Sequence, residues 1–184
     1  KFLRFDNQEK YVLENSNTVQ LNFKPPAHSW LEVYFRDNVS FRAVSRGYLD
    51  VKGILTAGVY DGNTNQKLVD TGRSYNLTKI KRDQGRVVFN KNYDIYGNSA
   101  EALNLANELN ETTDDYIVVI TTNDEPKGNR LVPRLKEALA RCGASKEIFE
   151  SSNFKFRSSY ILVGIPGCGP GNGHEAYNGI VDGD

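Results

Sequence analysis

The segment that decides the fold is residues 98–120, which read NSAEALNLANELNETTDDYIVVI. Asn98 can cap a helix, and Glu101 stands three residues later, which is the spacing of a capping box. The apolar residues that follow recur at the helical period and share one face: Ala102, Leu105, Ala106 and Leu109. The continuous apolar run 116–120 is typical of a buried strand. This segment therefore predicts a helix followed by a strand of a covered sheet.

A second helix and another strand are expected after residue 120. The helix begins near Pro133, because a proline in the first turn removes no helical hydrogen bond. It buries a stripe that ends with Cys142, and Gly143 is placed to terminate it. The apolar run 159–164 is the last predicted strand, and it leads into a loop rich in glycine, residues 164–173. Strands joined through helices predict some parallel pairing.

The first half of the chain reads as a series of short strands. Those before residue 50 are separated only by turns, which favours antiparallel pairing, and they fall at 11–13, 18–23, 30–35 and 39–44. The runs 53–60 and 67–71 flank a turn and predict a hairpin. The interval 76–88 is basic and is interpreted as a solvated surface that ends in a strand at 86–89.

Composition restricts the class of protein. The chain has 184 residues and a formal net charge of zero, which fits one globular domain and argues against nucleic acid as a partner. No apolar run reaches the length of a membrane span, so no membrane insertion is expected. Two cysteines are too few for a disulfide framework. The chain begins at Lys1 and contains no methionine, and we interpret it as part of a longer protein or a processed form.

The sequence contains no complete catalytic or metal-binding pattern. The histidines, His28 and His174, have no nucleophile in a recognisable motif beside them. Cys168 and His174 form a pair without the further ligands that zinc needs. The acidic pair Asp124-Glu125 follows the strand 116–120, but no second carboxylate is placed opposite it. We therefore expect no enzyme activity, no cofactor and no metal, and a hydrolase is the least favoured hypothesis.

Five stretches, in this order along residues 52–165, resemble the interleukin-like EMT-inducer or PANDER-type domain. They are the Lys52-Gly-Ile strand with its closing Leu-Val-Asp-Thr71, the segment Asn92-Tyr-Asp-Ile-Tyr-Gly97, the strand 117–120 with its acidic pair, the helix 130–143, and the stretch 156–164, which begins with Phe156-Arg157. Related domains occur in the stem of the protein O-mannose N-acetylglucosaminyltransferase and in cell-surface hyaluronidase-type proteins. Ser158 replaces the family's Asp, and the disulfide pattern of the cytokines is absent, which argues against a hormone-like role.

The resemblance implies a mixed α+β (α/β) fold, a compact sandwich of two β-sheets with two main helices. Residues 1–45 are expected to be a β-rich region of the same domain or a short accessory element, and 46–184 the family-like domain. By resemblance to the transferase stem, the ligand-binding residues are Asp124 and Arg157, with Lys52 or Arg46 as a third. A carboxylate and a guanidinium suit the hydroxyl groups of a sugar.

Two functions follow as expectations. The first is a non-catalytic, lectin-like module of a larger extracellular or virion-surface protein, whose partner is a glycan or glycoprotein. The second is a structural or adhesion domain that binds a protein partner in an oligomeric fibre or tail. The site hypothesis has its own alternative, in which Asp124 and Arg157 form only a structural ion pair. The binding hypothesis requires the strands 116–120 and 159–164 to be antiparallel, because only then do the two residues meet at one edge.

Overall fold

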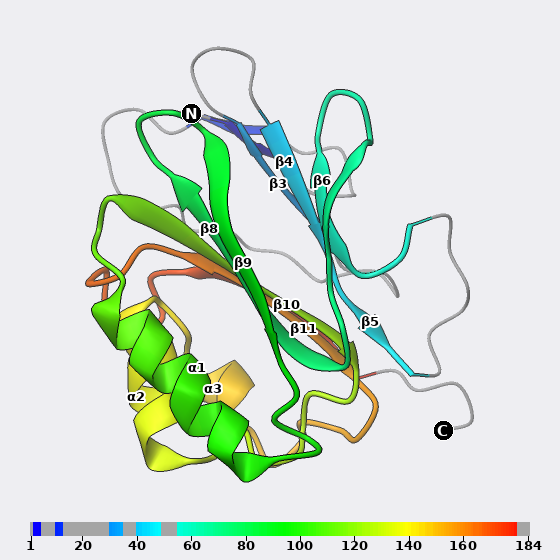
Figure 1. Ribbon diagram of the computed structural model, residues 1–184, viewed down its shortest axis with the longest axis vertical. Coiled ribbons are helices and arrows are strands. Elements are labelled where there is room, and N and C mark those ends of the chain that lie inside the picture. Colours follow the sequence, from blue (N-terminus) through cyan, green and yellow to red (C-terminus); the bar gives the residue numbers. More distant parts are fainter. Residues whose placement is uncertain (1, 5–9, 13–29, 35–39, 49–54, 180–184) are drawn as a thin grey trace.

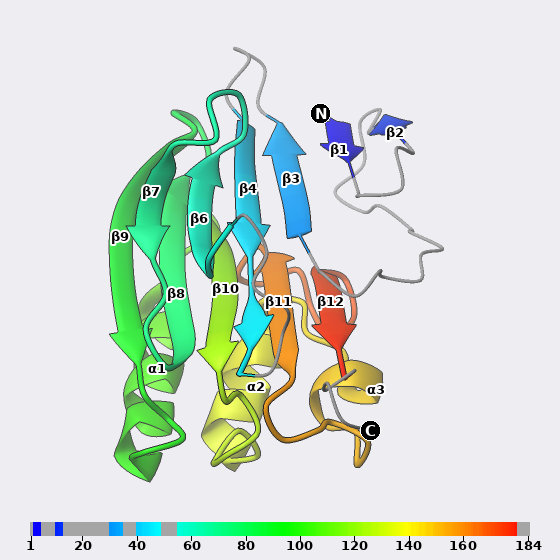
Figure 2. The same ribbon diagram turned by 90° about the vertical axis from the view of Figure 1, so that its right-hand side faces the viewer.

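The computed structural model describes residues 2–4, 10–12, 30–34, 40–48 and 55–179 of the chain. Its elements form two six-stranded sheets and a layer of helices (Figures 1 and 2). Sheet A contains β1 (Phe2–Arg4), β2 (Lys10–Val12), β3 (Trp30–Tyr34), β4 (Ser40–Val44), β6 (Gly58–Asp61) and β7 (Lys67–Asp70). Sheet B contains β5 (Arg46–Gly47), β8 (Ser74–Lys81), β9 (Arg86–Tyr93), β10 (Tyr116–Asp124), β11 (Ser159–Gly164) and β12 (His174–Asn178). The helices are α1 (Ser99–Glu111), α2 (Pro133–Arg141) and α3 (Lys146–Phe149).

The predicted class, a mixed α+β sandwich of two sheets with two main helices, is confirmed. The N-terminal strands are antiparallel as expected, and β4 joins β3 to the β6–β7 hairpin within one sheet. The expected strand at 18–23 lies outside the described residues. The division of the chain into 1–45 and 46–184 stays a prediction.

Strands joined by helices in sheet B are not parallel partners, so the expectation of parallel pairing through crossovers is wrong. The order is β12-β11-β10-β8-β9 with antiparallel pairing throughout. α1 connects β9 to β10, but these strands are not neighbours because β8 lies between them. α2 and α3 connect β10 to β11, and these two strands pair antiparallel. The connection through α2 runs to the far end of β11, and the segment after α3 returns to the edge where β10 ends. The one parallel contact in this sheet is the short β5, beside the end of β10.

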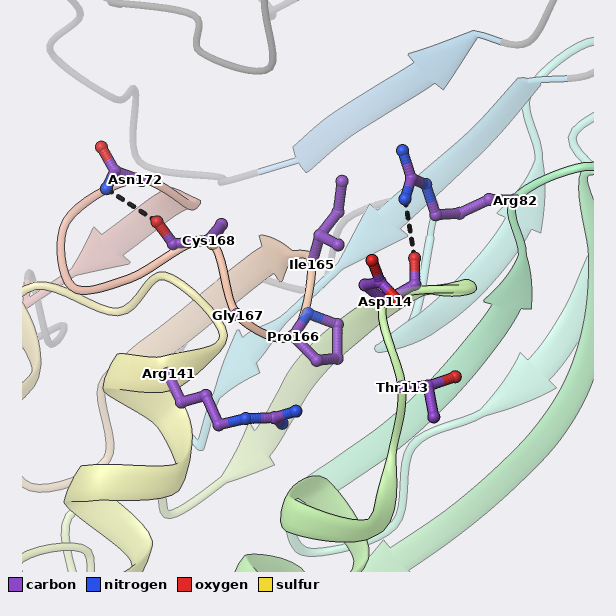
Figure 3. Close-up of a pocket in the computed structure, with 9 residues that line it drawn as sticks. All are labelled: Arg82, Thr113, Asp114, Arg141, Ile165, Pro166, Gly167, Cys168 and Asn172. Carbon is purple, nitrogen blue, oxygen red and sulfur yellow. Dashed lines mark hydrogen bonds between the residues drawn. The ribbon is translucent and has the colours of Figure 1, made fainter.

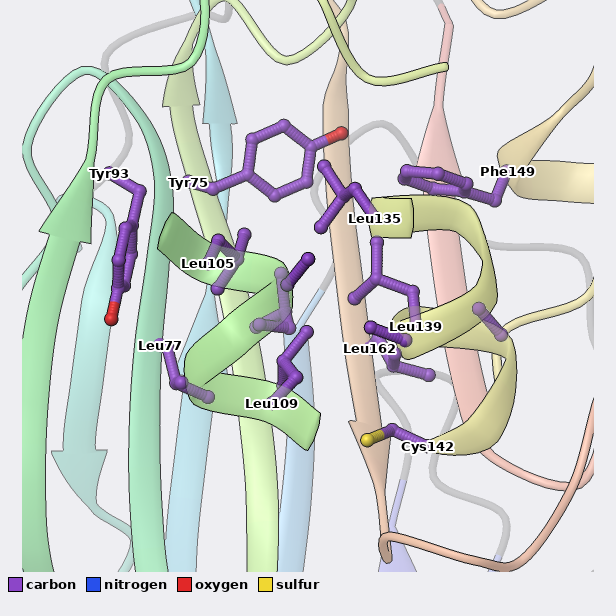
Figure 4. Packing of buried hydrophobic residues seen from close by; sticks show 14 of the residues in the cluster. Tyr75, Leu77, Tyr93, Leu105, Leu109, Leu135, Leu139, Cys142, Phe149 and Leu162 are labelled. Carbon is purple, nitrogen blue, oxygen red and sulfur yellow. The ribbon is translucent and has the colours of Figure 1, made fainter. Parts of the chain in front are cut away.

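Sheet B is buried on both faces. Sheet A covers one face, where Phe41, Ala43 and Val59 pack against Ile80, Ile117, Val119, Ile161 and Val163. The helices cover the other face with a larger cluster that includes Tyr75, Leu105, Leu139 and Tyr160 (Figure 4). Burying each large apolar side chain contributes about 1.5–3 kcal/mol, so the two faces together hold the three layers in place.

The two main helices begin where the sequence predicts, and α2 also ends where it predicts. The Asn98 side chain accepts a hydrogen bond from Ala100 N at 3.0 Å, and α1 buries the four predicted apolar residues. The reciprocal bond of a capping box is not made, because Glu101 instead accepts from the Asn104 side chain. α2 starts at Pro133, and Gly143 follows it with a φ of +108°, a left-handed conformation that favours glycine. Within the described residues, no helix combines the length and apolar character needed to cross a membrane.

The basic interval 76–88 is not the solvated surface that its charges indicate. Its first part, residues 76–81, belongs to β8, a strand between β10 and β9 whose residues 74–78 are buried. Its lysines reach the surface with their ammonium groups over aromatic rings: Lys79 lies 4.5 Å from the Phe89 ring and Lys81 4.7 Å from the Tyr116 ring. The glycine-rich loop is followed by β12, a strand that the sequence analysis does not predict.

Cys142 provides a test of the core under the helices. It is fully buried in the cluster of Figure 4, and burial raises the pKa of its thiol to about 12. Cys142→Ser should lower the free energy of unfolding by about 1–3 kcal/mol, because it places an underpaired hydroxyl in an apolar site. Cys168→Ser is the matched control, since Cys168 is only partly buried, and it should change stability by less than about 0.5 kcal/mol. Denaturant titrations in which both variants behave alike would contradict this placement.

Candidate functional site

Asp124 and Arg157 lie at the same edge of sheet B. Asp124 is the last residue of β10, and Arg157 comes two residues before β11 begins. β10 and β11 are antiparallel neighbours with Thr121 opposite Ile161, and this register continues to place Asp124 beside the start of β11. The geometric condition of the binding hypothesis is therefore met, while the role of the two residues in binding stays a prediction.

The neighbouring carboxylate, Glu125, holds this edge together. Glu125 is 1% exposed, and its Oε2 atom accepts a hydrogen bond from Arg157 N at 2.5 Å while Oε1 accepts from Lys127 N at 2.6 Å. Burial raises the pKa of Glu125, although these backbone donors act in the opposite direction by favouring the charged form. The acidic pair of the sequence thus divides into Glu125, which is structural, and Asp124, which is only partly buried and lines a cavity.

β5 adds a third segment to the edge. Arg46 and Gly47 pair with the end of β10, and Tyr48 N donates to the Asp124 carbonyl at 3.0 Å. A Cβ atom on Gly47 would lie 2.0 Å from the Arg157 carbonyl oxygen, so the backbones touch here without room for a side chain. No local pattern predicts this contact, because Gly47 stands in a short stretch without hydrophobic periodicity.

The guanidinium group of Arg157 stacks on aromatic rings rather than pairing with an acid. Its Cζ atom lies 4.2 Å from the centre of the Tyr48 ring and 5.3 Å from that of Phe156. Among the residues that the structure describes, Asp124 and Arg157 do not form an ion pair with each other, and neither charged group has a hydrogen-bond partner. The alternative, in which Asp124 and Arg157 form a structural ion pair, therefore does not agree with the structure.

A cavity of about 550 Å³ opens beside Asp124. Its polar lining includes Arg46, Lys67, Asp70, Asn123 and Asp124, and the exposed ring of Tyr48 forms part of its wall. Lys67 is bound by Asp70 and by the Thr56 hydroxyl. Two of the predicted site residues, Arg46 and Asp124, thus line the same cavity. Arg157 does not line it, but its guanidinium group stacks on Tyr48, which does. Lys52 lies outside the described residues.

Backbone strain gathers near this edge. Five described residues other than glycine have positive φ, and four of them belong to this end of the molecule: Ser74, Asp124, Asn129 and Arg157. Ser74 belongs to this end of the molecule because it pairs with Asn123 of β10. Asn129 lies in the loop that follows β10. Each such residue costs about 1–3 kcal/mol, and strain of this kind clusters at functional sites.

A second cavity, of about 650 Å³, lies at the opposite end of β10 (Figure 3). Its arginines are engaged with the backbone: Arg82 donates to the Asp114 carbonyl at 2.7 Å, and Arg141 donates to Leu109 and Thr112 carbonyls at the end of α1. The Asn172 side chain likewise donates to the Cys168 carbonyl at 2.9 Å. These groups hold loops and a helix end in place, which makes this cavity the weaker candidate.

The histidines and acidic residues of the described chain do not gather into a metal site. Within the described residues, no group of three His, Cys, Asp or Glu side chains is arranged to hold a metal ion. His174 lies in β12, where burial lowers its pKa, and His28 lies outside the described residues. The expectation of a protein without metal or catalysis stays a prediction.

Comparison with known families gives one match. The family model for the interleukin-like EMT inducer matches residues 73–168, which is just over half of the chain. The match spans β8 to the loop after β11 and contains Asp124 and Arg157. It begins later than the resemblance seen in the sequence, which starts at Lys52. A search of curated proteins found no match.

The tight contact at Gly47 predicts that replacing this glycine with alanine lowers the free energy of unfolding, whereas the same change at an uncrowded site would raise it. Gly47 does not have the left-handed φ that requires glycine, so Gly→Ala at an uncrowded site of this kind would stabilise by about 0.4–1 kcal/mol. The clash with the Arg157 carbonyl predicts the reverse for Gly47→Ala, a loss of about 1–3 kcal/mol in the free energy of unfolding. A neutral or stabilising result in chemical denaturation would show that β5 and the Arg157 segment are not in this contact.

Proposed function

We propose that this chain, which belongs to the interleukin-like EMT inducer family, is a non-catalytic carbohydrate-binding module of a larger extracellular or virion-surface protein. The observation that carries the proposal is the position of two oppositely charged side chains, Asp124 and Arg157, at one edge of sheet B. Among the described residues, neither the Asp124 carboxylate nor the Arg157 guanidinium has a hydrogen-bond or ion-pair partner. Tyr48, whose ring stacks with Arg157, lines the cavity beside Asp124. The partner is a glycan or the glycan of a glycoprotein.

The chemistry of these groups suits sugar hydroxyls. A carboxylate accepts two hydrogen bonds, and a guanidinium donates through a rigid planar fork, so neighbouring hydroxyls can be bound in pairs. Arg157 is already fixed by its stack on Tyr48, which reduces the side-chain entropy that binding would otherwise cost. The ring of Tyr48, 58% exposed, offers an apolar face for the C–H groups of a sugar.

The same geometry supports a role without catalysis. Hydrolysis of a glycosidic bond needs two carboxyl groups at a set separation across the substrate. Glu125 is buried and bound to backbone N–H groups, and Asp70, which lines the cavity with Asp124, is ion-paired with Lys67. Neither is available as a free partner of Asp124.

A structural or adhesion domain that binds protein is the second candidate. The observation that favours it is the exposure of Tyr48 and Phe156 beside Arg157, because tyrosine and arginine are enriched among the residues that dominate protein interfaces. Light scattering of the purified chain separates this candidate from the first, since self-association with no glycan bound would support an assembly role in a fibre or tail.

A glycan array with site variants tests the proposal. Asp124→Ala and Arg157→Ala should each weaken binding of the glycan selected on the array by at least about tenfold, or about 1.4 kcal/mol. The matched controls are Asp83→Ala in the β8–β9 turn and Arg86→Ala at the first residue of β9, both exposed, and they should bind as the unchanged protein does. Thermal melting checks that the site variants remain folded. Unchanged affinity in both site variants, or no bound glycan on the array, would overturn the proposal.

A further inference from the structure

The second cavity, at the end of the molecule away from Asp124, contains more positive than negative charge. The charged side chains in its lining are those of Arg82, Arg141 and Asp114, and we call it the arginine cavity (Figure 3). Within the described residues, neither arginine forms an ion pair, whereas the neighbouring Lys81 pairs with Asp115. Because a guanidinium group keeps its charge at any physiological pH, the arginine cavity has positive charge that no acid of the described chain neutralises.

Both arginines of the cavity bind backbone carbonyl groups of one short segment. Arg82 Nη1 donates to the Asp114 carbonyl at 2.7 Å, and Arg141 Nη2 donates to the Thr112 carbonyl at 3.2 Å. Residues this close in sequence are at most about 7 Å apart, even in an extended chain. The turn after β8 and the last residue of α2 therefore bring their guanidinium groups to the same segment of the loop between α1 and β10.

One edge of the Arg82 guanidinium group has no acceptor. Nε and Nη2 lie on the same edge and can bind the two oxygen atoms of one acid. Arg73 uses this edge on Asp94, with Nε donating to Oδ1 at 3.0 Å and Nη2 donating to Oδ2 at 2.5 Å. In Arg82, Nε is buried without a partner, and Nη2 makes no hydrogen bond within the described residues. Since Nε is covered by its surroundings, Nη2 is the atom of this edge that a ligand meets first.

The helix ends beside the arginine cavity do not present free carbonyl groups to an anion. The C-terminal end of a helix carries partial negative charge, and both α1 and α2 end here. At the end of α1, Arg141 binds the Leu109 and Thr112 carbonyl groups. At the end of α2, the Arg141 carbonyl accepts from Gly167 N and Gly169 N, at 2.9 and 3.4 Å. Arg141 and the glycine-rich loop thus satisfy the carbonyl groups that would otherwise oppose an anion.

We infer that the arginine cavity is a second binding site, which takes a tetrahedral oxyanion, namely a phosphate or sulfate group. Guanidinium groups bind such anions through planar sets of N–H donors, and a tetrahedral anion has acceptor oxygens for two guanidinium groups that do not share a plane. Arg82 supplies Nη2, and Arg141 supplies Nε, which makes no hydrogen bond within the described part of the chain. The inference is independent of the proposed function, because no residue lines both this cavity and the one beside Asp124.

Titration with inorganic anions tests the site. The probes are inorganic phosphate and inorganic sulfate, and chloride at matched ionic strength is the control, because salt alone screens surface charge. Backbone amide resonances of Thr113, Gly167 and Asn172, which line the cavity, should shift saturably with phosphate or sulfate and not with chloride. Saturable shifts confined to the edge around Asp124, or none with either anion, would overturn the inference.

Sugar esters distinguish the two sources of such an anion. Glucose 6-phosphate and glucose 6-sulfate carry the same group on a larger molecule. Binding of an ester at the same resonances about tenfold or more tighter than the free ion would assign the site to a phosphorylated or sulfated ligand. Equal or weaker binding of the esters would assign it to the free ion. Both results support an oxyanion site.

Two variants should change the affinity in opposite directions. Arg82→Gln removes the charge but keeps an amide that can donate to the Asp114 carbonyl, and should weaken binding by about tenfold or more. Asp114→Asn removes the carboxylate from the lining and keeps that carbonyl, and should strengthen binding by about threefold. Arg86→Gln, at the exposed first residue of β9 and outside the cavity lining, is the matched control and should stay within about twofold.

The Asp114 variant keeps the test decisive if the arginine variant fails to fold. Thermal melting shows whether Arg82→Gln is folded, because the Arg82 side chain also holds the loop before β10. The Asp114 side chain is exposed and makes no hydrogen bond within the described residues, so Asp114→Asn should keep the fold. Affinity that is unchanged or lower in Asp114→Asn would overturn the inference, as would equal affinity of folded Arg82→Gln and the unchanged protein.

Discussion

The carboxylate of Glu125 accepts hydrogen bonds from the backbone N–H groups of Lys127 and Arg157 in a place that water hardly reaches. Burying a carboxylate is costly, and it is tolerated here because charge-assisted hydrogen bonds to backbone N–H groups replace those to water. The two oxygens of this single carboxylate thereby connect the turn after β10 to the segment before β11. The contact of Gly47 with the Arg157 carbonyl fixes the same segment from the other side. The positions of Asp124 and Arg157 depend on these two contacts.

The left-handed conformations of Asp124 and Arg157 follow from this arrangement. Asp124 has a φ of 66°, and the chain turns there so that Glu125 is buried while Asp124 stays only partly buried. Arg157 turns in the same way, so its N–H group reaches Glu125 while its side chain lies over Tyr48. Buried contacts nearby offset the strain, and a site whose groups are already oriented loses less entropy on binding.

Local signals in the sequence predicted the helices well and the sheet less well. Asn98, Pro133 and Gly143 mark helix ends through hydrogen bonds and φ values that depend on a few neighbouring residues, so they can be read directly. β8 was missed because Lys79 and Lys81 make it look solvated, although both side chains extend past buried neighbours to aromatic rings. The antiparallel pairing of β10 and β11 depends on where the chain returns after α3, which no local pattern encodes.

The candidate site shows the same division. Asp124, Arg157 and Arg46 were predicted through a family resemblance, and the family match contains the first two. Tyr48 and Gly47 were missed, because their importance comes from a contact between segments about 110 residues apart. Tyr96 belonged to a stretch that carried the resemblance, but its exposure and its place beside Phe156 could be known only from the structure.

The distribution of charge at the site indicates how a ligand would be recognised. The chain has no net charge, and the groups around the Asp124 cavity include both signs: Arg46 and Lys67 against Asp70 and Asp124. Such a surface produces little long-range field, so it cannot select a ligand by attraction over distance as a basic groove selects nucleic acid. Selection must come from short hydrogen bonds and stacking, whose strength depends on orientation. The rigid backbone around Glu125 and Gly47 provides that orientation, and an uncharged ligand with many hydroxyl groups makes the fullest use of it.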